Sequence, residues 1–202
     1  MRDNIIIVGD SIAYGIGDPI DGGWSTMLKK YSIARPYSPN DVMRVHVAAF
    51  PGATTADITP RLDDIIKAYY DRSLMNTVII AIGVNDTRVT NGKTKVNIQD
   101  YRKNLVQIVN TINKNRCGMI FVGLTNVSGK DGILSFAHDK NYINKTINEY
   151  DSVLETLCLD NTIHYIKVRN EVTYEDLDDG LHPNNSGHKK IYEKVLNKIV
   201  KE

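Results

Sequence analysis

Short apolar runs, rich in β-branched residues, alternate along this chain with stretches of helical periodicity. The runs have the length of buried strands and cover residues 4–9, 43–49, 77–82, 119–124 and 163–168. Between them, apolar residues recur at spacings of four, three and four, as in Tyr101, Leu105, Ile108 and Ile112. Because strands alternate with helices, the sequence predicts an α/β fold with a parallel β-sheet covered by helices on both faces.

The size and composition of the chain are those of an ordinary globular protein. Its 202 residues contain no internal repeat, low-complexity tract or linker, so we expect residues 1–202 to form a single domain. Lys and Arg number 25 against 24 Asp and Glu without a basic stripe, so no nucleic-acid partner is expected. The longest apolar runs are strand-length, which predicts no membrane span.

The first residues of the chain bear on its location. Met1 to Asn4 lead directly into the first apolar run and leave no room for a signal peptide. A cytoplasmic protein is therefore expected, or a secreted one only if a leader has been removed.

A serine follows the first strand-like run directly. Ile5 to Val8 are followed by Gly9, Asp10, Ser11 and Ile12, which places Ser11 at the carboxyl edge of the predicted sheet, where ligands bind in such folds. Far downstream, Asp179 and His182 stand three residues apart. Serine, histidine and aspartate are the components of an acyl-transfer site. Taken alone, each motif is more often a helix cap or a surface turn than part of a catalytic site.

Two further blocks follow the second and third strand-like runs. In the first, Gly52 precedes Thr54 and Asp57, whose spacing resembles a capping box and predicts a helix start with a backbone N–H available to an anion. In the second, Asn85 and Asp86 follow Gly83 and supply an amide donor at the same edge. A turn glycine and an Asn-Asp turn are the plain alternatives.

In order and spacing, these blocks together resemble the SGNH hydrolases, also called the GDSL esterase/lipase family. The resemblance extends from Gly9 to His182. Ile12 stands where the family name has Leu, and residues 47–49 lack the Asn-x-Gly often found there. The resemblance implies a three-layer α/β/α fold whose flavodoxin-like sheet has five parallel strands in the order 2-1-3-4-5.

The resemblance also implies roles for these residues. Ser11 would be the nucleophile, His182 its base, and Asp179 the acid that orients the imidazole. The backbone N–H groups of Ser11 and Gly52 and the side chain of Asn85 would form the oxyanion hole. We expect the absence of a side chain at Gly52 to allow close approach to the substrate.

The remaining polar residues of the motifs are expected to support the site. Asp10 adjoins Ser11 and should shape the nucleophile turn by hydrogen bonding, and Asp86 should orient the Asn85 loop. Tyr14, Trp24 and the loop at residues 125–140 are candidate selectivity elements, although Trp24 also fits a helix-packing role. The long loop fits a lid over the site and a solvated surface loop equally.

These observations predict a serine hydrolase that cleaves small carboxylic esters or thioesters. The substrate would be a small-molecule ester, and neither a cofactor nor a metal is expected, since no histidine has a partner at metal-ligand spacing. An acyltransferase with a sugar or alcohol acceptor is the alternative enzyme, and a binding module on the same fold is a third reading. The oligomeric state stays open.

Overall fold

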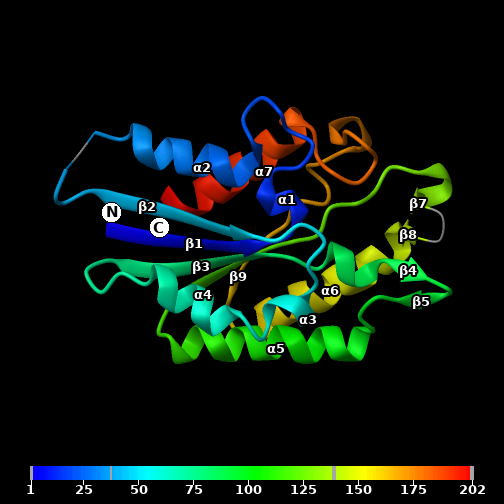
Figure 1. Cartoon of the computed structure of the whole chain (residues 1–202), viewed down its shortest axis with the longest axis horizontal. Helices are drawn as coiled ribbons and strands as arrows, with labels where there is room; N and C mark the ends of the chain where they lie inside the picture. Colours follow the sequence, from blue (N-terminus) through cyan, green and yellow to red (C-terminus); the bar gives the residue numbers. More distant parts are fainter. Residues whose placement is uncertain (1, 37, 138–139, 201–202) are drawn as a thin grey trace.

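A parallel β-sheet of five strands forms the centre of the molecule (Figure 1). The computed structural model describes residues 2–36, 38–137 and 140–200. In spatial order, the strands are β2 (Val42–Ala49), β1 (Arg2–Gly9), β3 (Met75–Ala81), β6 (Gly118–Val122) and β9 (His164–Ile166). Numbered among themselves, these strands have the order 2-1-3-4-5, so the predicted flavodoxin-like sheet is confirmed.

The predicted strand positions agree with the structure to within a few residues. β9 is the shortest strand and covers 164–166 rather than the predicted 163–168. In β1, consecutive residues face opposite sides of the sheet and are buried on both. An unbroken apolar run such as Ile5 to Val8 is typical of a parallel strand with helices on both faces.

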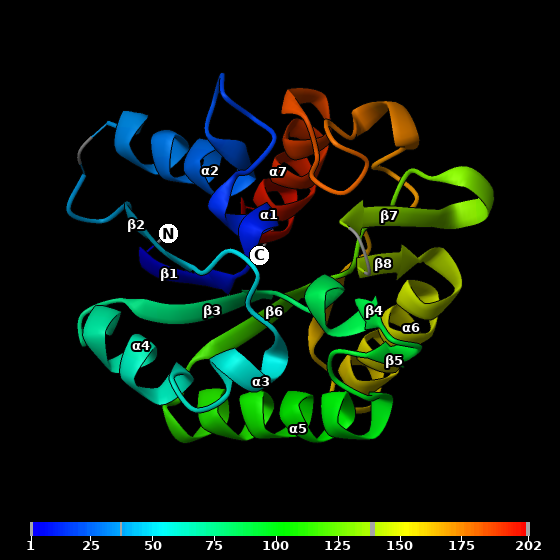
Figure 2. The ribbon, with the colours of Figure 1, turned by 45° about the vertical axis from the view of Figure 1, so that its right-hand side comes forward.

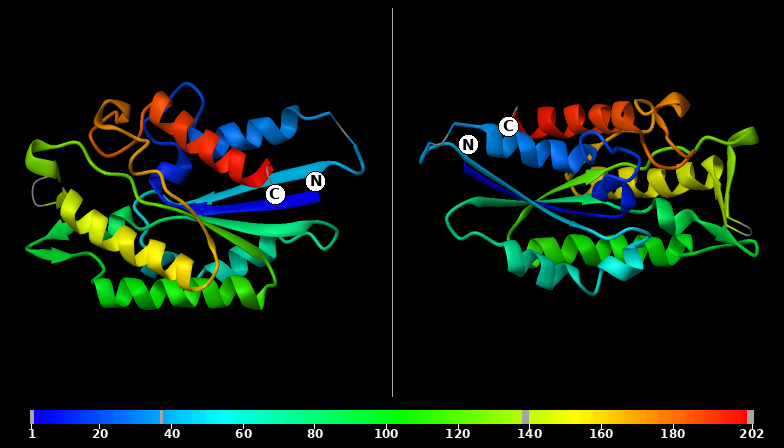
Figure 3. Two further views of the ribbon diagram at one scale, coloured as in Figure 1. Left: turned by 180° about the vertical axis from the view of Figure 1, so that it is seen from behind. Right: turned by 45° about the horizontal axis from the view of Figure 1, so that its top comes forward.

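Helices form a layer on each face of the sheet (Figure 2). One layer contains α1 (Ser11–Tyr14), α2 (Gly23–Ala34) and α7 (Asn185–Val200). The other contains α3 (Thr55–Ile58), α4 (Leu62–Tyr69), α5 (Ile98–Lys114) and α6 (Asn144–Asp160). The same three layers are seen from behind and in a view with the top of the molecule turned forward (Figure 3). The predicted α/β/α architecture is therefore confirmed.

The hydrophobic core is divided by the sheet into two clusters. Ile5 and Ile7 belong to the cluster that includes Trp24 of α2. Ile6 belongs to the other, which includes Leu105 of α5. Trp24 is fully buried in the first cluster, which agrees with the helix-packing role expected for it.

A second, smaller sheet lies at one end of the molecule and was not predicted. Its order is β5 (Lys93–Thr94), β4 (Val89–Thr90), β8 (Lys140–Ile143) and β7 (Ile133–Ala137), with antiparallel pairing throughout. The expectation of a loop over residues 125–140 is therefore wrong for the part that forms β7. Residues 138–139 of that segment lie outside the described residues.

The carboxyl ends of β1, β2 and β3 meet at one edge of the main sheet. Gly9 pairs with Ala49 on one side and with Ala81 on the other. The three polar blocks that follow these strands therefore start side by side, as the topology predicts. None of the described helices is both long enough and apolar enough to cross a membrane.

Candidate active site

Ser11 is the first residue of α1, directly after β1. The carboxylate of Asp10 caps this short helix, because its Oδ1 accepts a hydrogen bond from the Ile12 N–H at 2.9 Å. The abrupt change from strand to helix leaves the Ser11 side chain at the sheet edge, with 6 % of the residue exposed. The N–H of Ser11 is at the helix N-terminus, where backbone donors face outward.

Asp179 and His182 share one tight turn ahead of α7. Asp179 Oδ1 accepts hydrogen bonds from the backbone N–H groups of Leu181 (3.0 Å) and His182 (2.8 Å). Burial alone would raise the pKa of Asp179. The hydrogen bonds from the backbone and ring of His182 and from Leu181 outweigh that effect, so the pKa lies below its usual value. The carboxylate is therefore ionised at neutral pH.

The structure brings Ser11, Asp179 and His182 into one hydrogen-bonded chain. Asp179 Oδ2 lies 2.7 Å from His182 Nδ1, and His182 Nε2 lies 3.0 Å from Ser11 Oγ. The carboxylate can only accept, so Nδ1 carries a proton and a neutral ring has its lone pair on Nε2. That lone pair faces the serine hydroxyl, which is the geometry a general base needs.

Gly52 lies in the turn after β2 and has a positive φ of 79°. A Cβ at this position would meet no protein atom within 4 Å, so the positive φ, and not crowding by protein atoms, explains the glycine; the close approach of a substrate stays a prediction. The Gly52 carbonyl accepts a hydrogen bond from Lys95 Nζ at 3.1 Å. None of the hydrogen bonds among the described residues uses the Gly52 N–H.

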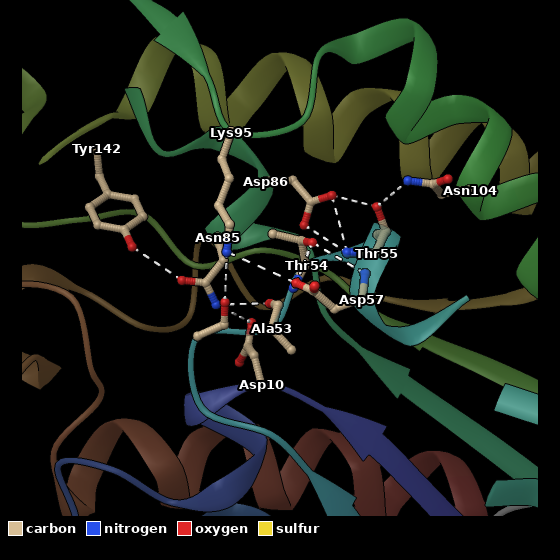
Figure 4. Close-up of polar contacts among 11 residues, drawn as sticks. Asp10, Ala53, Thr54, Thr55, Asp57, Asn85, Asp86, Lys95, Asn104 and Tyr142 are labelled. Carbon is tan, nitrogen blue, oxygen red and sulfur yellow. Dashed lines mark hydrogen bonds and ion pairs between the residues drawn. The ribbon is translucent and has the colours of Figure 1, made fainter. Parts of the chain in front are cut away.

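Asn85 lies in the 3₁₀ turn η1 (Val84–Thr87) and is buried (Figure 4). Its Nδ2 donates to the carbonyl of Ala53 at 3.1 Å and lies 3.5 Å from Asp10 Oδ2. An amide nitrogen has two hydrogens, so one is used by Ala53 and the other is directed at Asp10 Oδ2 in a long hydrogen bond at the sheet edge. The amide therefore ties the η1 turn to the turn that contains Gly52.

Asp86 joins the η1 turn to the start of α3, which follows the turn that contains Gly52. Its carboxylate accepts hydrogen bonds from the Thr55 N–H, at 3.0 Å to Oδ2, and from the Thr55 hydroxyl. Asn104 Nδ2 in turn donates to Thr55 Oγ1 at 3.0 Å. Burial raises the pKa of Asp86 to about 7, against the opposing hydrogen bonds from Thr55. The predicted capping box of Thr54 and Asp57 is present at the start of α3.

Asp10 is also fully enclosed. Burial raises its pKa to about 7, opposed by the hydrogen bond from Ile12 and increased by the charge of Asp86. An ionised carboxylate here would oppose negative charge near Asn85. The raised pKa lowers the average charge at Asp10 near neutral pH and so reduces that opposition.

Three contributors to this site were missed from the sequence: Thr55, Lys95 and Tyr142. Thr55 follows the predicted cap residue, so a signal for it was present. Tyr142 and Lys95 reach the site by tertiary packing alone. Of the selectivity candidates, Tyr14 is 59 % exposed and so remains available to a substrate. In the part of the chain that the structure describes, no group of three or more His, Cys, Asp or Glu could hold a metal ion.

The fold is similar to those of several solved esterase structures. The lipase/acylhydrolase from Enterococcus faecalis superimposes with a TM-score of 0.75 at 21 % identity, over 98 % of this chain and 95 % of that one. A variant of the acetyl xylan esterase Axe2 from Geobacillus stearothermophilus gives 0.74 at 19 %, over 98 % and 94 %. The psychrotrophic esterase EstA from Pseudoalteromonas sp. gives 0.71 at 18 %, over 100 % and 98 %.

Sequence comparison identifies the family. No curated protein matches the chain. The GDSL-like Lipase/Acylhydrolase family, however, matches residues 7–190, which includes every polar block described above. The chain therefore belongs to the GDSL-like lipase/acylhydrolase family and is a hydrolase of ester bonds.

Proposed function

We propose that this protein is a serine esterase that hydrolyses small carboxylic esters or thioesters through Ser11, His182 and Asp179. The observation that carries the proposal is the unbroken chain of contacts from Asp179 Oδ2 to His182 (2.7 Å) and from His182 to Ser11 Oγ (3.0 Å). A serine hydroxyl is a weak nucleophile on its own and becomes effective only beside an oriented base.

In the first half of the reaction, Ser11 Oγ attacks the ester carbonyl carbon while its proton moves to His182 Nε2. The carbonyl oxygen becomes an oxyanion, and Asp179 stabilises the imidazolium without taking its proton. The intermediate then collapses: the bond to the alkoxy or thio group breaks, and Nε2 returns the proton to that group. An acyl ester on Ser11 remains.

In the second half, water repeats the sequence. His182 Nε2 takes a proton from the water as its oxygen attacks the acyl carbon. The second tetrahedral intermediate collapses with cleavage of the acyl–Oγ bond, and the proton returns to Ser11. The products are a free acid and the unchanged enzyme.

The oxyanion would be stabilised by the N–H groups of Ser11 and Gly52 and by the second Nδ2 hydrogen of Asn85, which would exchange its long contact with Asp10 Oδ2 (3.5 Å) for the oxyanion. Support comes from the way these donors are held before any substrate binds. Lys95 and Asn85 fix the carbonyls of Gly52 and Ala53, at 3.1 Å each. Donors that need no rearrangement at the moment of reaction give the largest stabilisation.

The surroundings of Ser11 favour a small acyl group. Ser11 and His182 are both buried, and the segment before β7 lies beside the turn that holds Asp179 and His182, where the Ser128 N–H donates to the Gly180 carbonyl at 2.8 Å. A similar structure is an acetyl xylan esterase, whose acyl group is acetyl. We therefore expect acetyl and other short acyl esters to be the preferred substrates.

A panel of p-nitrophenyl esters tests this function. Acetate and butyrate should have a higher kcat/KM than octanoate, and acetyl thioesters should also turn over. Quantifying the free acid, with and without an added sugar or alcohol as acceptor, separates hydrolysis from transfer. Predominant acylation of the added acceptor would indicate an acyltransferase. An absence of turnover on every ester would contradict the proposal.

A further inference from the structure

Tyr142 contacts the amide of Asn85 from the smaller sheet. Its hydroxyl donates to Asn85 Oδ1 at 3.1 Å, and the residues are 2 % and 4 % exposed (Figure 4). Tyr142 belongs to none of the sequence motifs of the site. It reaches Asn85 from β8, which is separated from η1 by more than fifty residues.

The hydrogen bonds around Asn85 fix which way its amide faces. The Ala53 carbonyl can only accept, so the amide nitrogen must face it, at 3.1 Å. Asn85 Oδ1 then faces Tyr142, and the phenol must be the donor in that contact. If the amide turned over, its oxygen would face the Ala53 carbonyl and that bond would be lost, so Ala53 selects the orientation in which Tyr142 donates to Oδ1.

The backbone around Tyr142 is tied directly to the η1 turn. β4 begins two residues after that turn ends, and its Val89 pairs with Asn141, the neighbour of Tyr142. The Tyr142 phenol is enclosed, and its pKa is raised by burial against an opposing effect of the nearby Arg88 guanidinium. A cation beside the phenol oxygen makes the phenol a stronger donor to Asn85.

We propose that Tyr142 is a positioning residue of the oxyanion hole, acting through Asn85. A hydrogen bond accepted at Oδ1 holds the amide plane and polarises its N–H groups toward the oxyanion, because linked hydrogen bonds strengthen one another in a buried site. This inference rests on the proposed function, in which Asn85 donates to the oxyanion. It gives the antiparallel strands β7 and β8 a part in catalysis that needs no contact with the substrate.

Tyr142→Phe removes only the hydroxyl and keeps the packed ring. We expect kcat to fall about 10-fold on p-nitrophenyl acetate, the size of one lost hydrogen bond, with KM changed less than about twofold. A purely structural role would lower the melting temperature and leave kcat as it is. Unchanged kcat in the folded variant would overturn the inference.

Tyr150→Phe is the matched control. Tyr150 is equally buried, and its hydroxyl donates to the Val96 carbonyl at 2.6 Å, away from Asn85. The same atom is lost from a buried site, where it also lies 3.1 Å from Thr94 Oγ1, so stability should fall at least as much as in Tyr142→Phe. Its kcat should stay at the wild-type value, and an equal fall in both variants would contradict a specific role for Tyr142.

A double-mutant cycle tests whether Tyr142 acts through Asn85. Asn85→Ala should lower kcat by about 10²–10³-fold, the usual effect of losing one oxyanion donor. Adding Tyr142→Phe to Asn85→Ala should then lower kcat no further, since the amide that it positions is gone. If the decreases in kcat from the two substitutions instead multiplied in the double variant, the inference would be overturned. A wild-type kcat in Asn85→Ala together with a reduced kcat in Tyr142→Phe would overturn it as well. Neither result affects the role of Ser11, which its own variant tests separately.

Discussion

Ser11→Ala should lower kcat for p-nitrophenyl acetate by about 10⁴–10⁶-fold while the protein stays folded. The substitution removes the oxygen that would form the acyl ester, and the base has nothing left to activate. Among the described residues, the Ser11 hydroxyl has a side-chain hydrogen bond only with His182, at 3.0 Å, so its loss should disturb the fold little. Initial rates at saturating ester, with circular dichroism to establish folding, measure the effect.

Ser25→Ala is the control for this variant. The Ser25 hydroxyl is buried and donates to the Ala13 carbonyl at 2.5 Å, so its removal should lower stability. Because Ser25 lies in α2, outside the proposed machinery, kcat should remain within about twofold of wild type. Wild-type turnover by Ser11→Ala would show that another group is the nucleophile.

His182→Ala should be as damaging as Ser11→Ala, with a fall in kcat of about 10⁴–10⁶-fold. Without the imidazole, Ser11 has no base, and the ionised Asp179 loses its ring partner at 2.7 Å. Since nucleophile and base act as a unit, the variant with both substitutions should be barely slower than either alone.

The control is His46→Ala, since His46 stacks on Tyr69 with ring centroids 4.7 Å apart and lies within β2, away from the carboxyl edge. It should keep wild-type kcat. Losses that multiply in the variant with both Ser11 and His182 replaced would contradict a shared mechanism.

The main sheet could be predicted because its strands are marked by local composition. Ile5 to Val8 form an unbroken β-branched run, and the helices between strands repeat their apolar residues at helical spacing. The strand order came from the family resemblance, and the structure confirms it. The small sheet had no such signal, because β4 and β5 have two residues each and the pairing of Val89 with Asn141 joins distant segments.

The same distinction applies to the site. Ser11, Gly52 and Asn85 follow strands whose ends the topology brings together, so their proximity could be expected from the sequence. The positive φ of Gly52 could not be predicted, because it depends on the path of the turn and not on composition. Tyr142 was missed because its contact with Asn85 depends on how two sheets pack, which no local pattern encodes.

The most direct measurement is mass spectrometry of the protein after treatment with a fluorophosphonate. This reagent is attacked by an activated serine hydroxyl and leaves a stable phosphonyl ester. The account predicts one adduct per chain on the peptide containing Ser11, with labelling lost in Ser11→Ala and strongly slowed in His182→Ala. No adduct, or an adduct on another residue that persists in Ser11→Ala, would contradict the claim that Ser11 is the nucleophile activated by His182.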